Sequence, residues 1–582
     1  MRNAKIVCTL GPASDSRAAI RRLADAGMSV ARLNASHGTP EDRAEVLERI
    51  RAVDAATDTS LASMVDLQGP EIRTATTDAP VDLADGATVQ FVEGETSDGD
   101  VIGLSHPLTG VEAGDRVLLD DGRVETTVTA VDGETVTATV AAGGEVGSRE
   151  GVNVPGVDLD LATVTEADLR DIEVAVEGDA DLVAASFVRD AADVIAVEEA
   201  IAAHGVEIPV VAKIEREVAV GNVEEIVDAA YGVMVARGDL GVECPMEEVP
   251  VIQKRIVRTC NRTGTPVITA TEMLDSMIHE RRPTRAEASD VANAVLDGTD
   301  AVMLSGETAV GDHPVAVVDA MDRIVEHVET CEEYADRREN GVPVADETKT
   351  DALARSARFL ARDVDASAVV AVTESGYTAL KAAKYRPEVP VVAATPDETV
   401  RRRLALSWGV TAEHVPRGGS GVEDVIERSV EAALDAGAAD SGDTVVVLAG
   451  MMSGMKKWTT DVVKVHVAAE TLATGRGVVS GRAVGPVARA ADGDLTGVAE
   501  GSVLVLPDSF DGEFAGDPGT LAAIVAERPG MTGYAAMVAR ELGLPMVSGA
   551  SLSARDGTTV TVDGERGVIY DGDIRSSREE PT

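Results

Sequence analysis

The chain has 582 residues, of which 44% are hydrophobic, and it carries 52 basic against 101 acidic side chains, a formal net charge of −49. This much apolar material supports several folded domains of about 150 residues each and excludes intrinsic disorder as the reason for the charge. So acidic a chain offers no positive field for a nucleic-acid backbone or an anionic membrane. We therefore expect a folded protein with no nucleic-acid partner and no membrane partner.

The charge also indicates the solvent. Lysine is rare, with nine in the whole chain, and most of the carboxylates have no basic counterpart. Repulsion between them is screened at molar salt, where the Debye length falls to about 3 Å. A salt-rich, halophilic cytoplasm is the setting that we predict, and an ordinary acidic surface is the alternative.

The cysteines and the start of the chain favour the same compartment. Cys8, Cys244, Cys260 and Cys331 lie far apart without a C-x-x-C pair, so neither a zinc site nor a disulfide framework is expected. Met1 is followed by no charged region with a long apolar stretch, as a signal peptide requires, and no apolar run reaches about 18 residues. We expect a cytoplasmic protein.

The first two-thirds of the chain repeats a short β-branched run, a polar turn and an amphipathic Ala- and Glu-rich segment. Near-continuous apolar strands separated by helical patterns are typical of a closed parallel barrel, so we predict a (β/α)8 TIM barrel. The expected strands are Lys5–Thr9, Ser29–Leu33, Leu61–Asp66, Leu182–Ala185, Val210–Ile214, Gly232–Ala236, Val267–Ala270 and Ala301–Leu304.

An insertion interrupts the repeat between Asp66 and Leu182. From Pro70 to Pro155 the chain is rich in Thr, Val, Asp and Gly, in short alternating runs such as Thr126–Val131 and Glu134–Val140. Asp-Gly pairs separate these runs, which indicates a small antiparallel β domain that closes over the barrel mouth as a lid. These pairs are Asp98-Gly99, Asp121-Gly122 and Asp132-Gly133.

Two more domains follow the barrel. A second αβ alternation predicts an open α/β domain, with strands near Ala368–Val372, Val389–Ala393, Thr411–His414 and Asp443–Leu448. Beyond Thr471, glycine-punctuated strands such as Ser502–Leu506 and Thr558–Val562 surround one helix, Tyr534–Leu542. The predicted domains are a barrel over 1–69 and 156–338, an inserted β-barrel lid over 70–155, an α/β domain over 339–470 and a compact domain over 471–582.

Polar residues gather at the carboxyl ends of the expected barrel strands, where such barrels place their active sites. Arg32, Asn34 and Ser36 are spaced by two, so an extended chain points all three the same way. Asp66 ends the third strand, and its carboxylate beside Asn and Ser oxygens suits a hard cation. A turn-forming role is the alternative for Asn34, Ser36 and Asp66.

The fifth, sixth and seventh strands end on further chemistry. Lys213 and Glu215 are again two apart, and a lysine at a barrel mouth is costly unless it is paired. Asp239 adds a second carboxylate between glycines, and Glu215 with Asp239 makes the kind of pair that Mg²⁺ uses when substrate oxygens and water complete its shell. Thr271 brings a hydroxyl to the same rim, where it binds a phosphate or carboxylate or else caps a helix. A solvated ion pair is the alternative for the carboxylates.

One cation-binding rim with a lysine, an arginine and a lid suits phosphoryl transfer or enolate chemistry, and spacing alone leaves both open. The motifs themselves resemble one family, pyruvate kinase, over the first three predicted domains. They are Lys5-Ile6-Val7-Cys8-Thr9-Leu10-Gly11-Pro12-Ala13-Ser14, Gly27 to Gly38, Gly69-Pro70-Glu71-Ile72-Arg73-Thr74, Lys213-Ile214-Glu215, Val235-Ala236-Arg237-Gly238-Asp239-Leu240-Gly241, Ala270 to Met277 and Met303-Leu304-Ser305-Gly306-Glu307-Thr308-Ala309.

By that resemblance the chain transfers the phosphoryl group of phosphoenolpyruvate to ADP, giving pyruvate and ATP. The resemblance implies that Lys213 neutralises charge on the phosphoryl group in flight and on the enolate, and that Arg32 grips the phosphate. It implies that Glu215 and Asp239 hold Mg²⁺, and that Thr271 binds the substrate carboxylate near the face that is protonated. The implied substrate-binding residues are Arg32, Lys213, Gly238, Asp239 and Thr271.

A nucleotide site and a potassium site are implied in the same way. The nucleotide phosphates would contact Asn34, His37 and Arg73, and K⁺ would be held by Asn34, Ser36, Asp66 and the carbonyl of Leu67. The glutamate at position 71 resembles the members of the family that require potassium. In members with a lysine at this position, the lysine takes the place of the ion. Gln68, Val310 and Arg149-Glu150 stand where lysines are frequent, so the nucleotide contacts depart from the family more than the phosphoenolpyruvate site does.

The last two domains carry weaker resemblances. Thr373, Ser375, Gly376 and Thr378 form a hydroxyl-bearing turn before a helix, which resembles the family's effector loop for sugar phosphates or nucleotides; a capped helix start is the alternative. Residues 471–582 resemble the swivelling phosphohistidine domain of phosphoenolpyruvate-using enzymes, but Tyr534 stands where the histidine would be. A structural or assembly role, and the homotetramer that the family suggests, are the expectations.

Two other functions compete with the kinase. A Mg²⁺-dependent lyase or aldolase of pyruvate-like enolates shares the two-carboxylate site, but it needs neither His37 and Arg73 nor the lid and the potassium ligands. A non-catalytic, effector-binding scaffold does not need Lys213, Glu215, Asp239 and Thr271 together.

Overall fold

In the computed structural model, which describes residues 2–57, 59–417, 422–451 and 459–574, eight parallel strands close into a barrel. Their order around the barrel is β1-β17-β16-β15-β14-β13-β3-β2. The strands are β1 (Lys5–Thr9), β2 (Val30–Asn34), β3 (Ala62–Asp66), β13 (Leu182–Ala185), β14 (Val210–Ile214), β15 (Gly232–Ala236), β16 (Val267–Ala270) and β17 (Ala301–Leu304). All eight predicted barrel strands are present, and the predicted fold class is confirmed.

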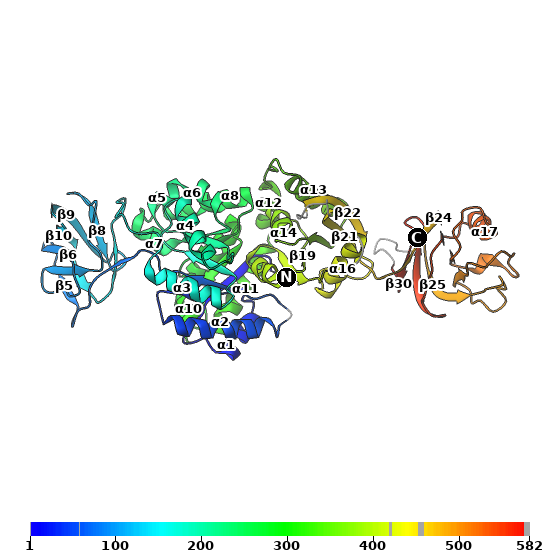
Figure 1. The fold of residues 1–582 in the computed structure, drawn as a ribbon, viewed down its shortest axis with the longest axis horizontal. Helices are drawn as coiled ribbons and strands as arrows, with labels where there is room; N and C mark the ends of the chain where they lie inside the picture. The colour runs from blue at the N-terminus through cyan, green and yellow to red at the C-terminus, as the bar shows by residue number, and fades with distance from the viewer. Residues whose placement is uncertain (1, 58, 418–421, 452–458, 575–582) are drawn as a thin grey trace. The chain divides into compact units, whose positions relative to one another are not determined.

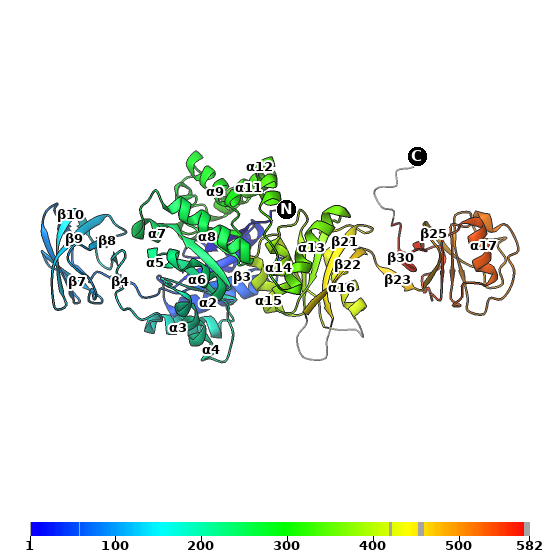
Figure 2. The same cartoon turned by 90° about the horizontal axis from the view of Figure 1, so that it is seen from above.

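The helices of the barrel lie outside the strands, as Figures 1 and 2 show. Threonines at three helix starts form capping boxes, in which the threonine hydroxyl and an acidic side chain three residues on satisfy free N–H groups at the start of the helix. The helices are α1 (Arg17–Asp25), α2 (Pro40–Asp54), α3 (Glu166–Glu177), α4 (Ala191–Ala202), α5 (Glu217–Gly221), α6 (Val223–Ala229), α7 (Arg237–Glu243), α8 (Val249–Thr263), α9 (Arg285–Asp297), α10 (Gly306–Ala309), α11 (Pro314–Glu329) and α12 (Glu332–Asn340).

Alternation along the strands divides the barrel core into two layers. One set of buried residues packs between strands and helices, and a second set, including Val30, Met64, Ala184 and Val211, fills the inside of the barrel. Leu406 belongs to the inner set, because the segment after α15 (Glu398–Arg403) lies at the amino-terminal end of the strands.

The insertion forms a β body of its own (Figure 2). Seven strands make one sheet in the order β4-β12-β8-β9-β10-β6-β7, and β11 pairs with β5. Residues 70–155 are all described, and a bridge between Thr74 and Leu104 connects β4 at one end of this order with β7 at the other. β6 pairs with β7 in parallel where only antiparallel pairs were expected. The strands are β4 (Ile72–Arg73), β5 (Val81–Leu83), β6 (Thr88–Glu93), β7 (Val101–Leu104), β8 (Arg116–Leu119), β9 (Val124–Asp132), β10 (Thr135–Ala142), β11 (Gly144–Val146) and β12 (Gly151–Asn153).

A five-stranded sheet follows, in the order β20-β19-β18-β21-β22. Its last strand runs antiparallel to β21 and was not foreseen. The strands are β18 (Ala368–Val372), β19 (Val391–Thr395), β20 (Val410–His414), β21 (Thr444–Met451) and β22 (Thr459–Val467), and the helices are α13 (Lys349–Asp363), α14 (Tyr377–Lys384), α15 and α16 (Val422–Asp435).

The final domain has an eight-stranded sheet, and the predicted helix, α17 (Tyr534–Leu542), packs beside strands β24 and β27 of this sheet. Its order is β23-β30-β29-β25-β26-β27-β28-β24. The strands are β23 (Thr471–Thr474), β24 (Arg476–Val479), β25 (Arg482–Arg489), β26 (Val503–Leu506), β27 (Ala523–Ala526), β28 (Met546–Ser548), β29 (Thr559–Asp563) and β30 (Val568–Asp571).

The chain divides into two compact units whose sequences interleave. The first comprises Met1–Asp346, Ser375–Arg386 and Asp397–Ala412, and the second comprises Glu347–Glu374, Pro387–Pro396 and Glu413–Thr582. Among the described residues, none of the helices has both the length and the apolar character needed to cross a membrane.

Candidate active site

The predicted site residues lie in the inner layer of the barrel, at the carboxyl ends of the strands. In β2 the inward residue Val30 is followed two positions later by Arg32, and in β14 Val211 is followed by Lys213. The strand register sets Asn34 opposite Asp66 across β2 and β3. Because side chains alternate along each strand, the charged residues face the inside of the barrel directly above its apolar interior.

Arg32 and Asp66 form the base of this layer. The Nε of Arg32 donates to Oδ2 of Asp66 at 2.6 Å, and its Nη1 donates to the hydroxyl of Thr9 at 2.9 Å. Asp66 is fully buried, which by itself raises its pKa, but Arg32 and Lys213 outweigh that effect and hold the pKa below its ordinary value. Two nitrogens of Arg32 are thus fixed, while no hydrogen bond of Nη2 occurs among the described residues.

Lys213 lies at the centre of the polar layer. Its Nζ lies 2.8 Å from Oε1 of Glu215 and 3.4 Å from Oδ1 of Asp66, and it donates to the hydroxyl of Ser186 at 2.7 Å. Burial favours the neutral amine, but Asp66 and Glu215 outweigh burial and raise the pKa of Lys213. Lys213 is therefore a fixed cation with a defined position.

Glu215 and Asp239 place two carboxylates side by side. Oε2 of Glu215 accepts the backbone N–H of Phe187 at 2.6 Å, so both of its oxygens are oriented. Burial, and then the negative charge of Glu215, raise the pKa of Asp239 to about 7. The two negative charges repel each other, and a bound cation would relieve that repulsion. Carboxylate oxygens are ligands that suit Mg²⁺.

The cation site is incomplete from protein ligands alone. Among the described residues no group of three or more His, Cys, Asp and Glu side chains is arranged to hold a metal. Substrate oxygens and water would complete the shell, as Mg²⁺ sites on phosphorylated substrates commonly require.

The predicted potassium ligands are neighbours in the fold. Asn34 and Asp66 are register partners, and Oδ1 of Asn34 accepts the N–H of Ser36 at 3.1 Å. The carbonyl of Leu67 accepts the hydroxyl of Ser186 at 2.7 Å. Asn34 and Ser36 lie at the end of β2, and Asp66 and Leu67 lie at the end of β3. Together they supply three neutral oxygens and one carboxylate.

Thr271 directly follows β16 and Gly238 is the second residue after β15, and the last residues of these two strands, Ala270 and Ala236, are register partners. The segment after Thr271 is fixed by Glu307, a buried carboxylate that accepts the N–H groups of Leu274 and Ser305 at 3.0 and 2.6 Å. Burial raises the pKa of Glu307.

Of the predicted nucleotide residues, Asn34 belongs to this cluster as the register partner of Asp66, whereas the contacts of His37 and Arg73 are with other residues. His37 is exposed in the loop after β2, where its carbonyl accepts Nη1 of Arg43. Arg73 lies on β4 of the insertion and donates twice to Oε2 of Glu71, at 3.0 and 2.7 Å. The effector candidates Thr373, Ser375 and Gly376 lie between β18 and α14, Thr378 lies in the first turn of α14, and Gly376, at φ +85°, precedes the helix.

Three residues of the site were missed from the sequence. Ser186 connects Lys213 with the carbonyl of Leu67, Thr9 holds Arg32, and Phe187 holds Glu215. The sequence carries a signal for Ser186, because Leu182, Ala184 and Ser186 continue one inward alternation past the end of β13. It carries the same signal for Thr9, which lies two residues after the inward-facing Val7. The role of Phe187 lies in its backbone, which composition does not reveal.

The comparisons with known proteins agree with this geometry. Three family models match: "Pyruvate kinase, barrel domain" over residues 1–318, "Pyruvate kinase, alpha/beta domain" over 351–466 and "PEP-utilising enzyme, mobile domain" over 498–567. Among relatives named pyruvate kinase, that of Geobacillus stearothermophilus is 43% identical over 584 residues, and that of Bacillus licheniformis is 39% identical over 584 residues. Each alignment covers 98% of this chain and 99% of the relative. From the charged barrel mouth to the mobile-domain match, the chain belongs to the pyruvate kinase family.

Proposed function

We propose that the chain transfers the phosphoryl group of phosphoenolpyruvate to ADP and releases pyruvate. The observation that carries the proposal is the connected group Arg32, Asp66, Ser186, Lys213 and Glu215, with Asp239 beside it, at the carboxyl ends of the barrel strands. A lyase needs the two carboxylates. It does not explain why Arg32 is held by Asp66 and Thr9 while its Nη2 makes no hydrogen bond to the described residues.

Each residue then has a defined task. Arg32 offers Nη2 to the phosphoryl oxygens while Asp66 and Thr9 fix its plane. Lys213 places its positive charge where charge develops on the transferring group and on the enolate oxygen. Thr271 binds the substrate carboxylate, and the enolate carbon accepts a proton on that side. His37 and Arg73 contact the nucleotide phosphates.

Mg²⁺ bound by Glu215 and Asp239 would neutralise charge on the phosphoryl oxygens and on the enolate. Glu215 is held in place without it, since it is tied to Lys213 and Phe187. The site is therefore preorganised and costs little rearrangement when substrate arrives.

The direct test measures pyruvate released from phosphoenolpyruvate and ADP with Mg²⁺ in molar KCl. We expect turnover by the unaltered chain and a loss of at least about 10³-fold in Lys213→Ala, because an electrostatic catalyst of the transition state is removed. Lys254→Ala is the matched control, since Lys254 on α8 is 42% exposed and pairs with Asp297 on α9. Full activity in Lys213→Ala, or none in the unaltered folded chain, would refute the proposal.

Potassium dependence is the second test. We propose that K⁺ lies between Asn34, Ser36, Asp66 and the Leu67 carbonyl, so KCl should support more activity than NaCl at equal concentration. Glu71→Lys should narrow that difference, because it brings a permanent positive charge to the position of Glu71. Equal activity of the unaltered chain in the two salts would discard the K⁺ site and keep the kinase.

The remaining assignments are proposals of the same kind. We infer a homotetramer, an effector near Thr373–Thr378 and a cytoplasmic, salt-rich setting, to which four unpaired cysteines are suited. The inserted domain would act as a lid, and the final domain would be structural. Its Tyr534 ring packs edge-on against Phe514 at 5.5 Å, which uses the side chain for packing rather than for phosphoryl transfer.

A further inference from the structure

Phe187 has a backbone conformation that its side chain does not favour. Its φ is +57°, and the other seven described non-glycine residues with positive φ are aspartates and arginines. A bulky aromatic residue rarely adopts this conformation, because its Cβ crowds the following carbonyl, so the surrounding structure must enforce it. The conformation has a visible result: the N–H of Phe187 points at Oε2 of Glu215, 2.6 Å away.

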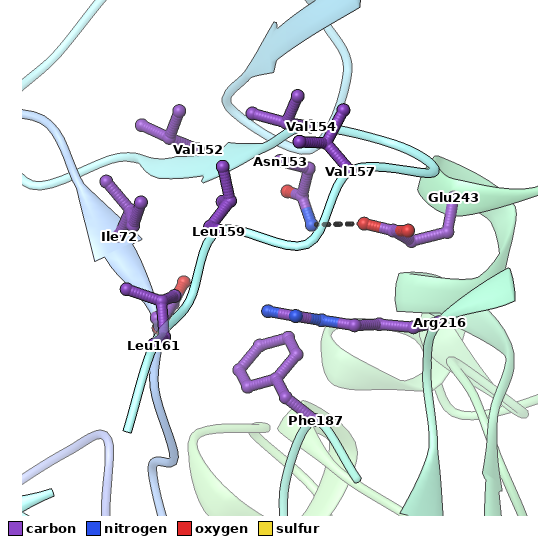
Figure 3. A pocket seen from close by; sticks show the side chains of 11 residues that line it. Ile72, Val152, Asn153, Val154, Val157, Leu159, Leu161, Phe187, Arg216 and Glu243 are labelled. Atoms are coloured by element: carbon purple, nitrogen blue, oxygen red, sulfur yellow. Dashed lines mark hydrogen bonds between the residues drawn. The ribbon is translucent and has the colours of Figure 1, made fainter. Parts of the chain in front are cut away.

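Two neighbours hold the Phe187 ring. The guanidinium carbon of Arg216 lies 5.0 Å from the ring centroid, and Figure 3 shows the guanidinium extending over the ring. The second neighbour is the backbone of Gly69, where an added Cβ would come within 3.1 Å of the ring and 3.0 Å of Ser186. We name these three residues, Gly69, Phe187 and Arg216, the Phe187 clamp.

Among the described residues the guanidinium of Arg216 makes neither a hydrogen bond nor a close ion pair, although its Nε is buried and the negative charges of Glu243 and Glu215 act on it. An arginine next to two carboxylates normally pairs with one, so a guanidinium placed over a ring instead indicates that its position serves the ring. Arg216 follows Glu215 in the chain and so fixes Phe187 from the same strand end.

The clamp borders the junction between the inserted domain and the barrel. Arg216 and Phe187 line a small cavity together with Glu243 of α7 and with aliphatic residues of the insertion, such as Ile72 and Val152 (Figure 3). Across the cavity, Asn153 donates to Glu243 at 3.3 Å, one helical turn after Asp239 on α7. Gly69 is the last residue before the insertion. A movement of the insertion therefore acts on the segments that carry both carboxylates.

We propose that Phe187, held by Gly69 and Arg216, is a positioning residue that aims its N–H at Glu215 and so couples the hinge of the inserted domain to the divalent-cation site. The inference rests on the proposed function only in taking Glu215 as a cation ligand. The clamp orients Oε2 of Glu215, while Lys213 holds Oε1.

The test measures Mn²⁺ binding to the protein alone, by the electron paramagnetic resonance signal of free Mn²⁺, and in parallel kcat and KM for phosphoenolpyruvate. We expect Arg216→Gln and Phe187→Leu each to raise the Mn²⁺ Kd about 10-fold, as loss of a support to a metal ligand does. Phe187→Tyr should keep the Kd within about twofold, and Arg216→Lys should fall between, because a cation over the ring is retained.

Two further variants separate the clamp from a general loss of structure. Arg216→Gln with Phe187→Leu should be no worse than the worse single variant, since both break one unit. Phe187→Gly relaxes the backbone and removes the ring, so it should behave like Phe187→Leu. Arg355→Gln is the control, because Arg355 lies 4.9 Å over Phe359 on α13, and it should leave the Kd unchanged.

The outcomes are distinct. An unchanged Kd in folded Arg216→Gln and Phe187→Leu, additive effects in the double variant, or normal binding by Phe187→Gly would overturn the proposal. Mn²⁺ binding without kinase turnover in the unaltered chain would refute the proposed function and still test the clamp. Absence of any Mn²⁺ binding by the unaltered chain would overturn both.

Discussion

At the scale of single residues, the site is a network in which each charged group has its position set by a neutral one. Thr9 fixes Arg32, Ser186 fixes Lys213, and the Phe187 N–H fixes Glu215. Hydrogen bonds to ionised groups are the strong ones, and in a buried layer they also set orientation. The neutral residues thus determine where the charges act.

Ser186→Ala tests that arrangement. Removing the hydroxyl takes away a hydrogen bond to Lys213 and leaves the Leu67 carbonyl without its donor, a cost of about 1–3 kcal/mol. We expect kcat/KM to fall about 5- to 150-fold with no loss of overall fold, measured by steady-state kinetics and circular dichroism. Ser356→Ala is the control, since its exposed hydroxyl on α13 bonds only the preceding turn. Unchanged kinetics in Ser186→Ala would mean that Lys213 is positioned by its carboxylates alone.

How far the site was predictable follows from this. Arg32, Asp66, Lys213 and Glu215 were predicted because charged side chains at strand ends are conspicuous, and the structure brings them into contact. Ser186 was missed because a serine after an alanine-rich strand looks like a turn residue. Phe187 was beyond sequence reasoning, because its contribution is a backbone N–H in an unfavourable conformation.

At the scale of elements, the barrel is closed at its amino-terminal end by a segment distant in sequence. Arg402 on α15 donates through Nε to Asp181 at 2.8 Å and through Nη2 to Asp179 at 2.7 Å, and Leu406 enters the inner apolar layer. Burial lowers the pKa of Arg402, but Asp181 and Asp179 outweigh it and raise that pKa. Asp181 precedes β13, whose far end carries Ser186.

Arg402→Ala should destabilise the barrel. Asp181 is fully buried, and although Arg51 still contacts it, loss of one partner of a buried ion pair costs about 3 kcal/mol. We expect a lower midpoint of urea unfolding by tryptophan fluorescence, to which the buried Trp408 contributes. The comparison variant is Arg262→Ala, whose pair with Glu224 is 62% and 72% exposed and contributes about 0–1 kcal/mol. Equal midpoints for the two variants would show that the arginine does not stabilise this end of the barrel.

Helices and strands could be predicted from the sequence where a single hydrophobic periodicity runs through the whole segment. All eight barrel strands follow from buried apolar runs of four to six residues, and α17 was predicted at its exact bounds. The insertion was harder, because the parallel pair of β6 and β7 is set by a connection that local pattern does not encode. β22 was missed although its alternating Val, Lys and His residues have the period of two that is typical of a half-buried strand.

At the scale of the whole molecule, charge decides the conditions under which the fold is stable. The 101 acidic side chains exceed the basic ones by 49, so even complete pairing leaves a large uncompensated negative charge. Its repulsion acts over about 10 Å at 0.1 M salt and over about 3 Å at 1 M. Salt also weakens attractive pairs, but the excess of one sign means that repulsion is the larger quantity being screened.

The midpoint of thermal unfolding should therefore rise in both KCl and NaCl when salt is raised from 0.1 to 2 M, since screening depends on ionic strength, and a bound K⁺ would add to the rise in KCl. Activity should separate the two salts, because a binding site distinguishes K⁺ from Na⁺ by size and hydration while a diffuse field does not. Sucrose at equal osmolality is the uncharged control and should stabilise less. A midpoint that is flat with salt would show that the carboxylates are too well hydrated to repel one another. A midpoint that rises only in KCl would instead place the stabilisation in the bound ion, since binding to the folded state alone raises stability by mass action.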